Sequence, residues 1–212
     1  RAGKKSYALH RFDFDDALYD PEAANLGLLG AVRKRVLRRA LERSVSIAGV
    51  VTTSNDHNAA WARSRGAATC IVPTSVDTGT IRPRPRSGVG TPVIGWIGTP
   101  STSRYLGIVE DALEEVVSSG RATVRLVGAS RNPFRRLQAE VKPWSLETEA
   151  SELAAFDIGI MPMPDTPWTR GKAAYKALQY GAAAVPTISS CTATNEEILG
   201  ERAGALLCRS ID

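Results

Sequence analysis

Short apolar runs alternate with helix-like stretches along residues 92–199, and this alternation constrains the fold more than any other feature. Each run has the length of a buried strand, and apolar side chains recur at helical spacing in the stretches between them. Strands that alternate with helices form a parallel sheet with helices on both faces. The sequence predicts strands at 92–98, 122–128, 157–161 and 184–189, and helices at 102–119, 147–156, from residue 171 onward, and at 195–199. Ligands of such sheets bind at the carboxyl ends of the strands.

The first part of the chain shows the same alternation over shorter elements. We expect strands at 6–12, 47–53 and 69–73, and helices at 28–44 and 58–65. Residues 78–91 hold alternating prolines and arginines followed by glycines, which suit neither helix nor strand and predict a linker. The predicted fold class is therefore α/β, with one domain over 1–77, a linker over 78–91 and a second domain over 92–212.

Composition is that of a folded enzyme or enzyme fragment. A chain of 212 residues with 43% hydrophobic and 23% charged residues can bury a core. It holds no run of about 18 apolar residues and no charged-then-apolar leader, so we predict neither a membrane span nor a signal peptide. The chain begins with Arg1 rather than Met, and its opening resembles the middle of a domain. We therefore expect further sequence upstream.

The cysteines indicate the redox compartment of the protein, and the net charge indicates the class of its partners. Cys70, Cys191 and Cys208 lie far apart without metal-ligand spacing, and only His10 and His57 could assist them. This pattern indicates structural thiols in a reducing compartment, so we expect a cytoplasmic protein. The net charge of +5 suits anionic partners such as nucleotides, lipid headgroups or nucleic acid.

Two lysines near the end of a predicted strand are the strongest candidates for chemistry. The strand at 157–161 runs into a proline-rich loop, and Gly171 is predicted to open a helix that carries Lys172 and Lys176 one turn apart. Unpaired backbone N–H groups, the helix dipole and two ammonium groups would favour a phosphate there. The alternative is a solvated helix face.

A second strand end offers a complementary set of groups. Gly98 ends the strand at 92–98 and allows a ligand to approach the backbone, while Thr99 and Thr102 supply hydroxyls for an anion. Because both loops follow strands of one predicted parallel sheet, we expect them to grip a diphosphate from two sides.

Several segments, in order, resemble a known family. The segments VIGWIGTPSTSRYL, VRLVG, FDIGIMPMPDTPWTRGKAAYKALQYGAAAVP and TNEEI look like the C-terminal nucleotide-sugar domain of glycosyltransferase family four, of the GT-B fold. Upstream, DFDDALYD, VVTTSN and IVPTSVD are similar to the later part of its N-terminal domain. The resemblance runs from about Phe12 to about Leu207, and it implies two Rossmann-like domains.

The resemblance implies a retaining, usually metal-independent transfer of a sugar from a nucleotide-diphosphate donor to a glycan, lipid-linked or small-molecule acceptor bound across an interdomain cleft. Lys172 and Lys176 would offset the charge of the leaving diphosphate and are the implied catalytic residues. The implied donor-binding residues are Gly98, Thr99, Thr102, Trp144, Ser145, Arg170, Gly171 and Gln179, with Trp144 and Ser145 next to the base. No cofactor and no metal are expected. The alternative is a nucleotide-binding module, or a truncated donor domain, without transfer activity.

The chain departs from the family pattern in its donor-binding helix. The E-x7-E pattern of the family is replaced, with Gly171 at the first glutamate and Gln179 at the second, and Ala184 stands where a glycine precedes Val185-Pro186. A neutral amide forms hydrogen bonds but adds no charge. Either a subgroup uses Gly171 and Lys172 instead, or donor binding is weakened; the two lysines favour the first interpretation.

An acidic cluster near the N-terminus has two interpretations. Asp13, Asp15 and Asp16 could hold a divalent metal through oxygen ligands. Their distance in sequence from the phosphate-binding segment argues against metal-assisted release of diphosphate, so we predict no metal site. We expect Asp15 or Asp16 to act at a strand end or on the acceptor side.

A basic amphipathic helix is predicted over residues 31–44. One interpretation is an exposed helix face, and the other is contact with an anionic membrane surface, through an apolar stripe flanked by arginines. Nucleic acid is not expected, because the helix lacks interleaved aromatic residues and no nucleic-acid module surrounds it. A lipid-binding protein without catalysis is a third functional class.

Overall fold

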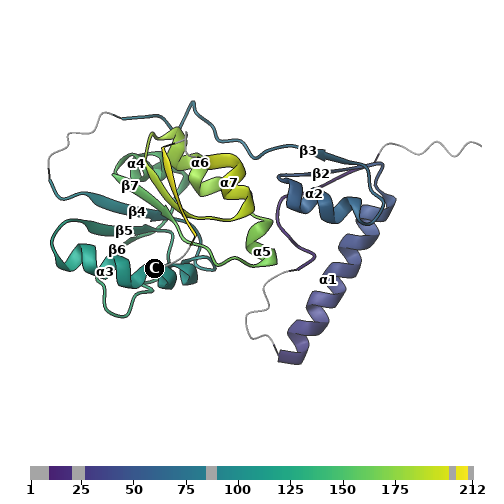
Figure 1. Cartoon of the computed structure of the whole chain (residues 1–212), viewed down its shortest axis with the longest axis horizontal. Helices are drawn as coiled ribbons and strands as arrows, with labels where there is room; N and C mark the ends of the chain where they lie inside the picture. The colour runs from purple at the N-terminus through teal and green to yellow at the C-terminus, as the bar shows by residue number, and fades with distance from the viewer. Residues whose placement is uncertain (1–9, 21–26, 85–89, 201–203, 210–212) are drawn as a thin grey trace, which may run out of the picture. The chain divides into compact units, whose positions relative to one another are not determined.

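The computed structural model describes residues 10–20, 27–84, 90–200 and 204–209, and the elements are drawn in Figure 1. The chain divides into two compact units. The first comprises Arg1–Thr74 together with Thr166–Ala173, and the second comprises Ser75–Asp165 and Ala174–Asp212. The segment Thr166–Ala173 therefore belongs to the first unit although it lies deep in the C-terminal half of the sequence.

The first unit is built on a small parallel sheet. Strands β1 (Arg11–Phe14), β2 (Val50–Thr53) and β3 (Thr69–Ile71) pair in the order β1-β2-β3, and helices α1 (Gly27–Ile47) and α2 (Asp56–Arg63) connect them. A short helix, α5 (Pro167–Arg170), is contributed by the distant segment. Of the strand expected at 6–12, residues 6–9 lie outside the described residues. The core of this unit holds Phe14, Ala17, Tyr19, Leu41, Val45, Val51 and Ala62, with Trp168 packed against it.

The second unit contains a six-stranded sheet that is parallel throughout. The strands are β4 (Val93–Ile97), β5 (Thr123–Val127), β6 (Glu140–Lys142), β7 (Ile158–Met161), β8 (Thr187–Ser190) and β9 (Ala205–Cys208). Their order is β6-β5-β4-β7-β8-β9. The chain winds outward in one direction from β4 and in the other from β7, so the point between these two strands is a topological switch point. The predicted α/β class is confirmed.

Helices cover both faces of this sheet. They are α3 (Glu110–Ser118), α4 (Leu146–Ala154), α6 (Tyr175–Ala182) and α7 (Ala193–Leu199), with a 3-10 helix, η1 (Ser103–Val109), before α3. The helix expected at 102–119 thus begins as a 3-10 segment. Successive residues of β4 serve opposite faces: Trp96 clusters with Leu113, whereas Ile97 clusters with Leu153. None of the helices in the described ranges is long and apolar enough to cross a bilayer.

Two glycines and a tyrosine shape the switch point. Gly95 and Gly159 are register partners on β4 and β7. A Cβ at Gly95 would lie 1.9 Å from the ring of Phe156, and one at Gly159 would lie 2.6 Å from the ring of Tyr180. Because neither glycine has a side chain, the two rings lie directly on the sheet, 6.3 Å apart in an edge-to-face arrangement.

The hydroxyl of Tyr180 joins β4 to β7 beyond their last paired residues. It accepts a hydrogen bond from the Ile97 N–H at 3.2 Å and donates one to the Ile160 carbonyl at 3.1 Å. Burial raises the pKa of this phenol, so the proton that it donates stays in place across the physiological range.

We expect Tyr180→Phe to lower the free energy of unfolding by about 1–3 kcal/mol, because a buried N–H and a buried carbonyl lose their partner. The measurement is the shift in the chemical denaturation midpoint. Tyr175→Phe is the matched control, since Tyr175 is 44% exposed, and we expect it to shift stability by less than about 0.5 kcal/mol. Equal effects of the two variants would contradict this role of Tyr180.

Candidate functional site

A pocket of about 560 Å³ opens at the carboxyl ends of the second unit's strands. This volume lies within the usual range for small-molecule sites. The lining is contributed by the end of β4, by the loops after β4, β5 and β6, by α4 and by the first turns of α6. It consists of Ile97, Gly98, Thr99, Pro100, Gly128, Ala129, Ser130, Pro143, Trp144, Glu149, Tyr175, Lys176 and Gln179. All of these residues belong to the second unit.

Two glycine turns that line the pocket are in close contact. Gly128 has a φ of +86°, and a Cβ on it would lie 2.1 Å from the carbonyl oxygen of Gly98. Its N–H donates to the carbonyl of Lys142 at 2.9 Å, while the N–H of Gly98 donates to the carbonyl of Val127 at 3.0 Å. Only a glycine satisfies both the backbone conformation and the close approach at position 128.

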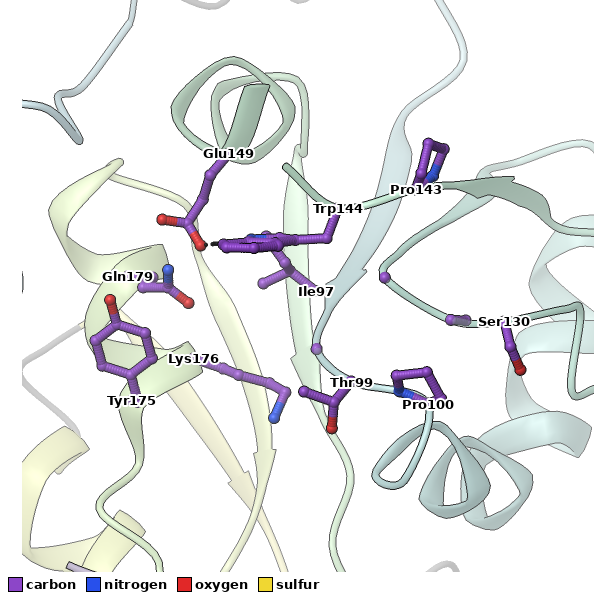
Figure 2. A pocket seen from close by; sticks show the side chains of 13 residues that line it. Ile97, Thr99, Pro100, Ser130, Pro143, Trp144, Glu149, Tyr175, Lys176 and Gln179 are labelled. Carbon is purple, nitrogen blue, oxygen red and sulfur yellow. Dashed lines mark hydrogen bonds between the residues drawn. The ribbon is translucent and has the colours of Figure 1, made fainter. Parts of the chain in front are cut away.

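Lys176 lies against the Gly98 turn. A Cβ at Gly98 would come within 2.7 Å of the lysine Cε, so the absent side chain is what admits the lysine stem. The ammonium lies 5.8 Å from the ring centroid of Trp96, and Figure 2 shows it beside Thr99. Lys176 and the Gly98 turn therefore lie side by side in the second unit.

The hydroxyl groups of the turn after Gly98 form hydrogen bonds with one another and with the backbone of the same turn. Thr102 donates its hydroxyl to the Thr99 carbonyl at 3.1 Å, and the hydroxyls of Thr99 and Ser101 lie 2.9 Å apart. Thr99 lines the pocket, whereas Thr102 does not. Thr102 therefore closes the turn.

The opposite side of the pocket is formed by Trp144 and α4. The indole N–H of Trp144, a residue that is 50% exposed, donates to Glu149 at 2.9 Å, and Figure 2 shows the bond. Ser145 is the N-cap of α4 and accepts the N–H of Thr148 at 3.3 Å. Ser145 is not among the lining residues, so its place in the structure is that of a helix cap.

Helix α6 supplies three side chains to the pocket. Gln179 is 2% exposed, and its Nε2 has no hydrogen-bond partner within the described part of the chain. Tyr175 also lines the pocket, and burial together with the charge of Glu149 raises the pKa of its phenol. Lys176 lies between them in sequence, so one helix presents an ammonium, an amide and a phenol.

The predicted helix start at Gly171 is wrong. Gly171 is the C-cap of α5, and α6 begins only at Tyr175, after Ala174 in a left-handed conformation with φ 53°. Lys172 and Lys176 therefore do not lie one turn apart on one helix. Arg170, Gly171 and Lys172 belong to the first unit, whereas Lys176 belongs to the second.

Two asparagines that are distant in the sequence explain why α5 ends at Gly171 and why no single helix carries both lysines. The side chain of Asn55 donates to the carbonyl of Gly171 at 3.0 Å, and the side chain of Asn58 donates to the same oxygen at 3.0 Å. A Cβ at Gly171 would meet Ala17 at 2.6 Å, so the glycine permits close packing here. Both amides are buried, so the carbonyl is held in a region without solvent.

The acidic residues of the first unit have separate partners. Asp16 forms an ion pair with Lys172 through both carboxylate oxygens, at 2.8 and 2.9 Å. Asp13 accepts a hydrogen bond from Thr52, and the backbone carbonyl of Asp15 accepts one from Ser54 at 3.0 Å. The Nζ of Lys172 also lies 4.4 Å from the ring centroid of Trp168.

Sequence reasoning missed Glu149, Tyr175 and the turn at Gly128. Gly128 ends a predicted strand, as Gly98 does, so the rule that selected Gly98 could have selected it as well. Glu149 lies on a predicted helix, and nothing in the sequence marks it as facing the pocket.

No protein-family model matches the sequence, and no curated protein matches it. Solved structures do match. The Anabaena protein HepE, in complex with UDP and glucose, is 16% identical with a TM-score of 0.64, over 94% of this chain and 57% of that chain. A UDP-forming α,α-trehalose-phosphate synthase from Burkholderia xenovorans is 14% identical with a TM-score of 0.62, over 95% and 57%.

The catalytic domain of starch synthase IV from Arabidopsis thaliana, bound to ADP and acarbose, is 14% identical with a TM-score of 0.52, over 74% of this chain and 42% of that chain. The chain thus spans about half the length of the structures it matches. At such identities the likeness establishes the fold. These neighbours are GT-B glycosyltransferases, and the chain shares their Rossmann-like α/β fold.

Proposed function

We propose that the second unit binds a nucleotide-diphosphate sugar and that the chain is the donor-binding part of a retaining glycosyltransferase resembling family four. The observation that carries this proposal is the pocket at the switch point, with the Lys176 ammonium beside the Gly98 turn. Its size suits a nucleotide, and its single lining lysine suits a diphosphate. The structural neighbours that bind UDP and ADP support the same ligand class.

The proposed reaction places the developing negative charge next to Lys176. The bond between the sugar C1 and the phosphate oxygen breaks, and its electron pair stays on the departing diphosphate. An acceptor hydroxyl bonds to C1 on the face that the diphosphate leaves, and its proton departs with the diphosphate. The Lys176 ammonium stabilises the diphosphate electrostatically as its charge grows. The proposal requires no metal.

We expect Lys176→Ala to weaken the binding of the preferred nucleoside diphosphate about tenfold to hundredfold and to lower turnover by about 10²–10³. Calorimetry with UDP, ADP and GDP, paired with an assay of donor hydrolysis and transfer, measures both. Lys34→Ala on α1 is the matched control and leaves nucleotide binding unchanged, because Lys34 lies in the first unit. A melting temperature that falls in proportion to activity would instead assign Lys176 a packing role.

The same assays distinguish the alternative of a non-catalytic module. Such a module binds a nucleoside diphosphate through Lys176 but neither hydrolyses nor transfers the sugar. Binding without turnover, in the presence of an acceptor panel of glycans, lipid-linked sugars and small molecules, would therefore favour the module over the transferase.

We further propose that α1 contacts an anionic membrane surface on the cytoplasmic side. Only Gly30, Leu41 and Val45 are buried among the described side chains of this helix. Val32 is 54% exposed and Val36 is 60% exposed. Their spacing of four residues places them on one face of the helix.

Charge favours lipid headgroups as the partner of this face. Lys34 and Arg38 are paired with Asp20 and Glu42. By contrast, the described residues provide no ion-pair partner for the remaining basic side chains of the helix, which are Arg33, Arg35, Arg39 and Arg43. An apolar stripe flanked by arginines that pair with no described residue suits the interface of an anionic bilayer.

We expect the double substitution of Arg39→Gln with Arg43→Gln to weaken binding to phosphatidylglycerol-containing vesicles roughly thirtyfold, at about 1 kcal/mol for each arginine. Vesicle co-sedimentation measures the effect. Arg38→Gln is the control, because that arginine is already paired with Glu42. Binding that is equal on neutral phosphatidylcholine vesicles, or no binding at all, would overturn the membrane proposal.

A further inference from the structure

The pocket of the second unit carries opposite charges at two places. Figure 2 shows the Lys176 ammonium beside Thr99, and the Glu149 carboxylate beside Trp144 on the other side of the pocket. A carboxylate repels a phosphate and the ammonium attracts it, so a bound nucleoside diphosphate would direct its phosphates toward Lys176. The nucleoside then faces Trp144 and Glu149.

Glu149 is a carboxylate that forms no ion pair with the residues that the structure describes. No lysine or arginine in the described ranges forms an ion pair with it, whereas Glu152 on the same helix pairs with Arg125 and Lys142. The indole N–H of Trp144 occupies one of its oxygens. Since a carboxylate has about four acceptor positions, Glu149 retains the capacity to accept further hydrogen bonds from a ligand.

Gln179 provides a second and independent indication of a ligand. Its Nε2 is buried and has no partner among the described residues, although it lines the pocket. A buried amide that lacks a partner is costly, and a small rotation of this side chain toward the pocket would let Nε2 donate to an acceptor oxygen of a ligand. The amide can donate to a ligand, but it supplies no negative charge.

We propose that Glu149 determines nucleoside specificity by supplying, from α4, the negative charge that Gln179 on α6 does not carry. Its carboxylate accepts hydrogen bonds from two adjacent donors of the nucleoside. The vicinal 2′- and 3′-hydroxyls of ribose present such donors, and so does the edge of guanine that carries N1–H and the 2-amino group. This inference rests on the proposed function of the same pocket.

The test is calorimetry on the intact chain with inorganic pyrophosphate, with UDP, ADP, GDP and IDP, and with the 2′-deoxy form of the best ligand. We expect Glu149→Gln to weaken binding of the best nucleoside diphosphate about tenfold to hundredfold, since hydrogen bonds to a charged group are lost. Pyrophosphate binding does not weaken, because the variant removes a carboxylate that repels phosphate. Glu147→Gln on the same helix is the matched control, because Glu147 does not line the pocket.

The nucleotide panel also shows whether Glu149 accepts its hydrogen bonds from the ribose hydroxyls or from guanine. If Glu149 recognises the ribose, the wild type binds the 2′-deoxy nucleotide more weakly than the ribonucleotide, and Glu149→Gln loses that discrimination. If Glu149 recognises guanine, the wild type binds GDP more tightly than IDP, which lacks the 2-amino group, and Glu149→Gln loses this preference. A variant that is only misfolded would lose pyrophosphate binding too, and its thermal melt would reveal it.

Three results would overturn the inference. Wild-type affinities and discrimination in Glu149→Gln would remove the role of Glu149 while leaving the proposed function intact. A wild-type chain that binds neither pyrophosphate nor any nucleoside diphosphate would remove both. Loss of pyrophosphate binding in well-folded Glu149→Gln would also contradict it, because it would place Glu149 at the phosphate end.

Discussion

The hydroxyl of Tyr180 is the interaction on which the second unit's site depends. Strands β4 and β7 pair at Ile94 with Ile158 and at Gly95 with Gly159. Beyond those pairs, the phenol bonds to a backbone N–H of one strand and a carbonyl of the other. It satisfies both buried groups where the two strands no longer pair directly. The strands can therefore separate toward their carboxyl ends, next to the Gly98 turn and the pocket.

The same tyrosine positions the functional side chains of α6. Its ring rests on Gly159, which fixes the height of the helix above the sheet. Gln179 precedes it directly, and Lys176 lies one turn earlier on the pocket side. Ala174 adopts a left-handed conformation just before the helix, which is unfavourable for a residue with a Cβ. The packed helix compensates for this local cost, and the helix start is thereby set at Tyr175.

The alternation of strands and helices could be predicted because local sequence carries it. Gly98 and Lys176 could be selected as well, since carboxyl ends of parallel strands are known ligand positions. The end of α5 at Gly171 could not, because it depends on Asn55 and Asn58, more than a hundred positions earlier in the chain. Strand β6 was missed for a related reason: Glu140 and Lys142 are charged, and their pairing with β5 is a tertiary contact.

Charge rather than area is expected to govern recognition in this pocket. Most of its lining is apolar or backbone, and the charged side chains among the lining residues are Lys176 and Glu149. Apolar walls reduce the local dielectric response, so each charge acts on a ligand more strongly than it would in open water. An ammonium at one side and a carboxylate at the other impose a direction on any nucleotide that enters. The net charge of +5 would attract many anions to the protein, whereas under the proposed function this opposed pair would distinguish the phosphate end of a ligand from its nucleoside end.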